Sequence, residues 1–126
     1  MANNAERIKP VHVTDENGNV YELDFNREAI KFAEGRGFNT DDVIKFPVSK
    51  FPDLFFFAFR MHHKNVARSQ TDKMFYARYD ADDEKHEEIK TKLMERLVEL
   101  YAQAMNANTI GASEDEGKNV KVTVEL

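Results

Sequence analysis

Two stretches of the sequence contain histidines that could bind zinc. The stretch that begins at His86 starts like the zinc-protease motif, but Lys90 stands four residues later, where that motif needs a second histidine. His62 and His63 are adjacent, and adjacent side chains on a helix point about 100° apart, so they cannot hold one metal from the same face. We therefore expect no metal site and interpret His62 and His63 as polar residues at the end of an apolar helix.

An acidic segment shares only its carboxylates with a calcium-binding loop. Asp80, Asp82, Asp83 and Glu84 could provide oxygen ligands, but their spacing lacks the glycine turn and the terminal glutamate of such a loop. A solvated acidic loop is the better interpretation. The chain has no cysteine, which excludes disulfides, cysteine zinc sites and cysteine nucleophiles and is typical of a reducing compartment.

Sites for nucleotides and nucleic acids are not indicated. Gly35 and Gly37 follow a predicted helix rather than a strand, and the Gly-Lys-Ser/Thr end of a phosphate-binding loop is missing. Basic and aromatic residues alternate between Arg60 and Arg78, which is one pattern of nucleic-acid binding. However, 18 Lys and Arg face 23 Asp and Glu, a net charge of -5, which argues against this function. We expect no nucleic acid, no small-molecule substrate, no cofactor and no enzymatic activity.

Length and composition fit one soluble domain. The 126 residues, 41% of them hydrophobic, are enough for one modest core. The first ten residues are polar, so no secretory signal is expected. The longest strictly apolar run, Leu54–Phe59, is far shorter than the roughly 20 residues of a membrane span, and we expect no contact with a membrane.

An N-terminal hairpin is the first predicted element. Apolar and polar residues alternate over 11–14 and 21–25, and Asn17 and Gly18 lie at the turn between them. A two-stranded hairpin is only marginally stable alone, so its apolar face must pack on helices. Asn26 is expected to cap the helix that follows.

Ten phenylalanines make the chain unusual, and they cluster in one predicted helix. This helix is expected to begin at Ser49, with Pro52 in its first turn. Apolar side chains point in almost every direction around it, apart from a polar wedge of Asp53, Arg60 and Lys64. A helix of this kind is either the centre of the core or is shared between the core and a partner.

Two further helices and a tail complete the prediction. A helix capped by Ser69 is expected up to Tyr79, and an amphipathic helix is expected over 89–105, where apolar residues recur every three or four positions. The composition of 106–119 indicates a flexible linker. Residues 120–126 alternate like a strand, which we expect to pair with an exposed edge of the hairpin or of a partner.

The predicted fold class is α+β, mainly α-helical, with the N-terminal hairpin packed on about four helices. Residues 1–105 form a single globular domain, and 106–126 form a flexible linker with a strand-like tail. Because the apolar arcs of the phenylalanine helix and of the last helix are broad for one small core, we expect a homo-oligomer that associates through them. Phe56 is assigned to this interface, and Phe55 and Phe59 to the core.

Short sequence motifs typical of one protein family are spread over most of the chain and are densest over 52–66. They comprise Tyr21 to Phe25; Asn26, Arg27, Glu28, Phe32, Ala33, Glu34, Arg36, Gly37 and Phe38; Pro52, Asp53, Leu54, Phe55, Phe56, Ala58, Phe59, Arg60, His62, His63, Asn65 and Val66; Thr71, Asp72 and Lys73; Leu97, Glu99, Leu100 and Tyr101; and Val122 to Leu126. In these residues the chain resembles the tail assembly chaperones of long-tailed bacteriophages, in the version common in phages and prophages of Gram-positive bacteria. It departs from that pattern over 80–90 and after Asn106.

The resemblance implies a non-enzymatic morphogenesis factor in the host bacterial cytoplasm that is not part of the mature virion. Such chaperones coat the tape-measure protein and bring tail-tube protein to it. One alternative is a small cytosolic adaptor or regulator that binds one folded host protein through the phenylalanine helix. Another is an enzyme that uses His62, His63 and the acidic residues with a metal.

We predict that the residues for protein interaction lie on the phenylalanine helix, on the last helix and in the tail. They are Phe51, Leu54, Phe56, Phe57, Arg60, His63, Leu97, Tyr101, Val122 and Val124.

Overall fold

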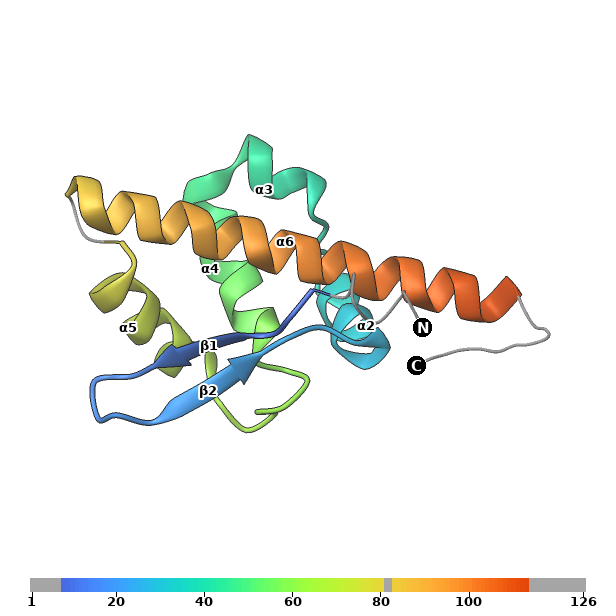
Figure 1. Cartoon of the computed structure of the whole chain (residues 1–126), viewed down its shortest axis with the longest axis horizontal. Coiled ribbons are helices and arrows are strands. Elements are labelled where there is room, and N and C mark those ends of the chain that lie inside the picture. Colours follow the sequence, from blue (N-terminus) through green and yellow to red (C-terminus); the bar gives the residue numbers. More distant parts are fainter. Residues whose placement is uncertain (1–7, 81–82, 114–126) are drawn as a thin grey trace.

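The computed structural model describes residues 8–80 and 83–113 (Figure 1). A two-stranded antiparallel hairpin is followed by five helices, which confirms the predicted α+β, mainly helical fold. The elements are β1 (Val11–Thr14), β2 (Val20–Leu23), α2 (Arg27–Gly35), α3 (Asp41–Lys45), α4 (Pro47–Ala58), α5 (Arg68–Arg78) and α6 (Glu84–Ser113). In Figure 1, α6 runs along the whole molecule, and the hairpin, α2 and α4 lie beside it.

The hairpin forms where the alternation of residues predicts it. Val13 pairs with Tyr21 and Val11 with Leu23. The Asp15 carboxylate holds the turn, because its Oδ1 accepts the backbone N–H groups of Asn17 and Asn19 at 2.9 Å each. Gly18 has a φ of +87°, which a residue with a side chain rarely adopts.

The N-cap predicted for α2 is confirmed. Asn26 Oδ1 accepts the backbone N–H of Ala29 at 2.9 Å, which satisfies one of the free N–H groups of the first turn. Ala29, Ile30 and Ala33 form the buried side of this helix. Gly37 follows the helix with a φ of +84°.

Helix α4 is the centre of the fold, but it begins earlier than predicted. It starts with Pro47 at the first helical position rather than at Ser49, because proline has no N–H to leave unsatisfied there and its φ suits a helix. Pro52 consequently lies inside the helix and not in its first turn. The helix contacts α2, α3, α5 and α6, and Leu54, Phe55 and Phe57 are buried among them.

Asp53, one residue of the predicted polar wedge, pairs with α5, which begins at Arg68 and not after Ser69. Gln70 Oε1 accepts the N–H of Ala67 at 2.8 Å, and this bond replaces the predicted serine cap. Arg68 then reaches Asp53 at 2.8 Å and Asp72 at 2.8 Å. Asp53 therefore serves the packing of one helix on another, whereas Arg60 and Lys64 lie beyond the end of α4 at Ala58.

Helix α6 is longer than predicted at both ends. Its first turn includes Glu84 and Glu87, whose negative charges suit a helix N-terminus. The helix continues to Ser113, so the expected flexible linker is wrong for 106–113. Glycine and asparagine cost a helix at most about 1 kcal/mol each, which a helix already nucleated by its packed part tolerates. Val122 and Val124, and the tail interaction predicted for them, lie outside the described residues.

A single core buries most of the apolar side chains of α4 and of α6. Leu93, Leu97, Leu100 and Tyr101 of α6 are buried together with the apolar face of α4 and of the hairpin. The breadth of the arcs, which led us to expect a homo-oligomer, is therefore largely explained by a single chain. Within the described residues, no helix is both long and apolar enough to cross a membrane.

Candidate functional site

The structure divides the predicted interaction residues into a buried and a partly exposed group. Leu54, Phe57, Leu97 and Tyr101 are at most 4% exposed. A folded domain cannot offer these four side chains to a partner, so their assignment to an interaction surface is corrected. The reason is that α4 is the central helix of the core, which was one of the two interpretations of its all-round apolar surface.

Phe55 and Phe59 are buried, as predicted. Their rings meet at a centroid distance of 5.1 Å in an edge-on arrangement. Phe51 and Phe56 are half-buried and pack against the core from its rim. These two are therefore the phenylalanines of α4 that keep surface available to a partner.

Phe56 belongs to an arginine–aromatic patch, which we define as Phe32, Phe56, Arg36, Arg60 and Arg68. The guanidinium groups of Arg60 and Arg36 lie 4.1 and 4.5 Å from the centroid of the Phe32 ring. Arg68 lies 5.6 Å from the centroid of Phe56. Such cation–π contacts stabilise the cations over the rings. Because Arg68 already pairs with Asp53 and Asp72, Arg36 and Arg60 give the patch the basic character that suits an acidic partner segment.

His63 has a structural role. Its Nε2 accepts the backbone N–H of Glu22 at 3.0 Å, and its ring packs edge-on against Tyr21 at 5.1 Å. Burial and the neighbouring His62 lower the pKa of His63. The neutral ring thereby attaches the loop after α4 to strand β2.

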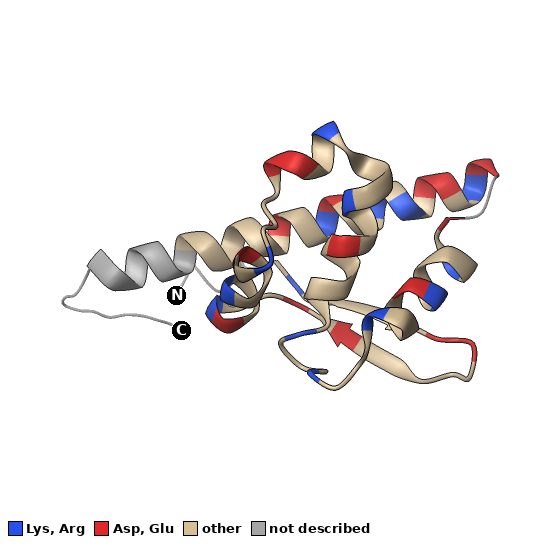
Figure 2. Cartoon of the chain, turned by 180° about the vertical axis from the view of Figure 1, so that it is seen from behind, with Lys and Arg blue, Asp and Glu red and all other residues tan. Residues whose placement is uncertain are grey.

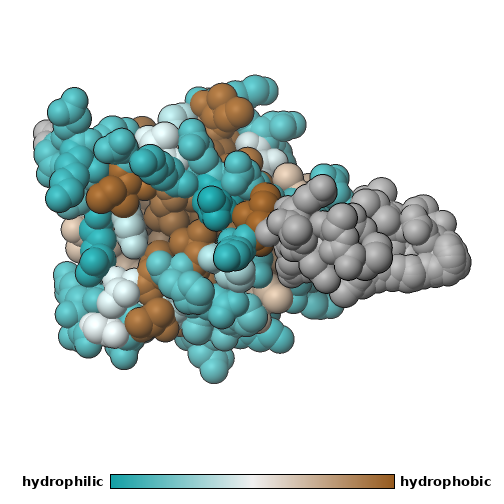
Figure 3. All heavy atoms as spheres, in the orientation of Figure 1, coloured by the Kyte–Doolittle hydropathy of each residue, from teal (hydrophilic) through white to brown (hydrophobic). Residues whose placement is uncertain are grey.

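Sequence reasoning missed an exposed cluster of apolar side chains where α3 meets α4. Ile44, Phe46 and Val48 are 87%, 57% and 89% exposed, and we refer to these three as the apolar corner. Figure 3 shows hydrophobic atoms at the top of the molecule, at the place where Figure 1 labels α3. The alternation of apolar residues around Pro47 is a signal that could have found it, since such a pattern does not fit one face of a helix.

The acidic segment caps α6 and pairs with it. Asp83 Oδ1 accepts the backbone N–H of His86 at 2.8 Å, and these contacts with His86 lower the pKa of Asp83. Lys90 Nζ lies 2.9 Å from Asp80. Figure 2 shows charges of both signs along this end of the helix, whereas 100–113 carries none.

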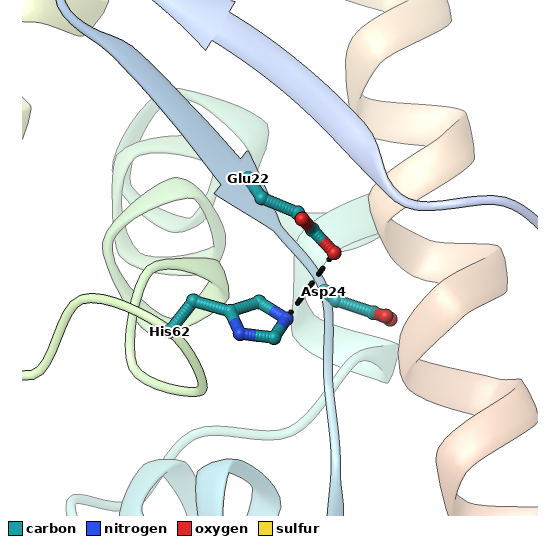
Figure 4. Close-up of side chains that lie close together, drawn as sticks. All are labelled: Glu22, Asp24 and His62. Atoms are coloured by element: carbon teal, nitrogen blue, oxygen red, sulfur yellow. Dashed lines mark ion pairs between the residues drawn. The ribbon is translucent and has the colours of Figure 1, made fainter.

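A cluster of potential metal ligands lies where the end of β2 meets the loop after α4. Glu22, Asp24 and His62 each offer a ligand atom, and these atoms all lie within 4.8 Å of one another. Glu22 Oε2 is 3.3 Å from His62 Nε2, and Figure 4 shows these two side chains pointing toward each other. Glu22 Oε1 is 3.8 Å from Nε2 of His12 on the paired strand. Glu22 and Asp24 were not among the metal ligands considered from the sequence, because they lie about 40 residues before His62.

Comparison with known proteins places the chain in a family. The search of curated proteins and the search of solved structures give no match. The family comparison matches residues 1–126 to a domain of unknown function, DUF5055. The chain therefore belongs to the DUF5055 family.

Proposed function

We propose that this protein is a phage tail assembly chaperone, a non-enzymatic protein of the host cytoplasm that binds tape-measure and tail-tube proteins and does not remain in the virion. Short sequence motifs that resemble those of this family are the first support for the proposal. The structure adds surfaces of the kind that bind proteins. The apolar corner is the single observation that carries the argument.

The apolar corner is exposed although the protein has a complete core elsewhere. Ile44 and Val48 are almost fully exposed, while Val43, their neighbour in α3, is buried. Contiguous exposed apolar side chains lower solubility and commonly mark a site that a partner covers. Because the corner is not needed for the core, its apolar character is best explained by binding.

The tape-measure protein is the partner whose chemistry fits best. A long hydrophobic chain offers repeated apolar side chains, which the apolar corner can cover without a deep pocket. The arginine–aromatic patch provides a second contact in which guanidinium groups can pair with carboxylates. The adaptor alternative was based on the phenylalanines of α4, of which only Phe51 and Phe56 keep exposed surface.

The test is co-expression with the tape-measure protein encoded in the same genome. Wild-type protein should raise the soluble fraction of the tape-measure protein and purify with it. The double variant Ile44→Ser/Val48→Ser should lose both effects. Val20→Ser is the matched control, since Val20 is a 62% exposed apolar residue on the hairpin, and it should behave like wild type.

Two results would overturn the proposal. One is a tape-measure protein that stays insoluble with wild-type chaperone. The other is a double variant that binds and solubilises the tape-measure protein as well as wild type does. A stoichiometric complex with one folded host protein, together with no effect on the tape-measure protein, would favour the adaptor alternative.

A further inference from the structure

We propose that Glu22, Asp24 and His62 bind one divalent transition-metal ion, with Zn²⁺ as the ion that fits best. The site is independent of the proposed chaperone function. It would connect β2 to the loop after α4, two segments far apart in the sequence. It also revises the expectation, drawn from sequence spacing, that the chain has no metal site.

The distances between the ligand atoms fit a small metal ion. Zinc bonds of about 2.0–2.1 Å at tetrahedral angles place neighbouring ligand atoms about 3.3–3.4 Å apart. Glu22 Oε2 and His62 Nε2 already lie 3.3 Å apart. Asp24 lies beside them, and the ligand atoms of all three residues are within 4.8 Å of one another. Its carboxylate is buried, and its Oδ1 accepts the backbone N–H of Phe25 at 2.8 Å, so closing the site around an ion requires the more exposed side chains of Glu22 and His62 to move toward Asp24.

The surrounding residues hold the ligands in place. His63 accepts the backbone N–H of Glu22 at 3.0 Å, which fixes the loop that carries His62 against β2. His12 faces the other oxygen of Glu22 at 3.8 Å, from the position paired with Glu22 across the hairpin. Partners of this kind orient metal ligands and commonly change metal affinity 10–100-fold. His63 is thus a positioning residue, whereas His12 at 3.8 Å is too far from Glu22 for a hydrogen bond.

The ligand set favours zinc over the common hard cations. One imidazole nitrogen with two carboxylates suits Zn²⁺, whereas Ca²⁺ and Mg²⁺ prefer six or more oxygen ligands. The two carboxylates also balance the charge of the ion. Three protein ligands leave a fourth position for water or for a carboxylate of a bound partner.

Titration of tag-free, chelator-treated full-length protein with Zn²⁺ tests the site. Calorimetry should show one Zn²⁺ per chain, and Zn²⁺ should raise the melting temperature. His62→Ala and Glu22→Gln should each weaken the affinity at least 10-fold. His86→Ala is the matched control, because His86 also lies close to a carboxylate, 2.7 Å from Asp83, but outside the site; it should leave the isotherm unchanged.

Circular dichroism of each variant without metal shows whether it is folded. Visible absorption of the Co²⁺-loaded protein gives a second readout, which should disappear in His62→Ala. The proposal is overturned if wild type binds no Zn²⁺, if both ligand variants bind it as wild type does, or if His86→Ala removes the stoichiometric binding. In the first of these cases, Glu22 and His62 form an ion pair only.

Discussion

The apolar corner and the phenylalanines of α4 are close in sequence and similar in composition, yet they have opposite environments. Ile44, Phe46 and Val48 are exposed to solvent. Phe55 and Phe57, which lie about two helical turns after Val48, are enclosed by α2, α5 and α6. Hydrophobicity alone does not separate the two groups. What separates them is how many other helices lie close to each point of α4.

The largest expected effect is in the buried region. Phe55→Ala should lower the free energy of unfolding by about 3–5 kcal/mol, because it removes a fully buried ring and leaves a cavity. Urea denaturation monitored by circular dichroism measures this, with Val48→Ala as the exposed control from the same helix. A loss below 1 kcal/mol in Phe55→Ala would mean that the two regions do not differ as the structure shows.

A second variant tests how completely the core excludes water. Tyr101 is buried, and within the described residues its hydroxyl has no hydrogen-bond partner. Burial raises the pKa of Tyr101 to about 12 from its usual value of 10. In the folded state the Tyr101 hydroxyl therefore keeps its proton at a pH where the same hydroxyl of the unfolded chain has lost it. The free energy of unfolding consequently falls as the pH rises from 10 to 12.

Tyr101→Phe should remove this part of the pH dependence. The rise of the Tyr101 pKa from 10 to about 12 corresponds to a loss of about 2–3 kcal/mol in the free energy of unfolding between pH 10 and pH 12. Near pH 7, the variant should be as stable as wild type or more so, because a buried hydroxyl without a partner costs about 1–3 kcal/mol. Denaturation curves of both proteins from pH 7 to pH 11 provide the comparison. About half of the difference, roughly 1.4 kcal/mol, should be present at pH 11, and parallel curves would contradict the prediction.

The sequence predicted the elements of the fold better than their ends. The hairpin and the cap at Asn26 depend on neighbouring residues, so alternation and turn chemistry were enough to find them. The start of α4 and the far end of α6 differ from the prediction, because α4 begins at Pro47 and α6 continues to Ser113 through residues with weak helix propensity. Local patterns identify a helix more readily than the residue at which it begins or ends, since a helix nucleated by its packed part can extend past weak positions.

The candidate sites were predicted less well, because contacts between distant segments cannot be inferred from local patterns. The motifs that resemble tail assembly chaperones suggested a function that can be tested. However, half of the residues that were assigned to binding on the two predicted helices, such as Leu54 and Leu97, form the core. Periodicity shows that a helix side is apolar and does not show what covers it. The cluster of Glu22 and His62 was missed because its members meet only after β2 and the loop after α4 fold together.

Phe56 lies between the two regions and should show an intermediate effect. Phe56→Ser removes ring contacts with Phe32 at 6.2 Å and with Phe57 at 5.5 Å, so a loss of about 1–2 kcal/mol is expected. If the chain associates through this surface, as a coat on a tape-measure protein requires, light scattering should show oligomers for wild type and folded monomers for the variant. Wild type that stays monomeric at high micromolar concentration would contradict self-association, and an unfolded variant would contradict the placement of Phe56 at the interface.

The smallest effect is expected at the apolar corner itself. Ile44→Ser/Val48→Ser should change the free energy of unfolding by less than about 0.5 kcal/mol, since both side chains are almost as exposed in the folded chain as in the unfolded one. Urea denaturation of this double variant beside Val20→Ser measures the difference. A loss of several kcal/mol would show that the corner packs against part of its own chain, and binding data on the double variant would then report misfolding. A loss near zero, together with lost binding of the tape-measure protein, would assign the corner to a partner, because the substitution would then act only where the partner is present.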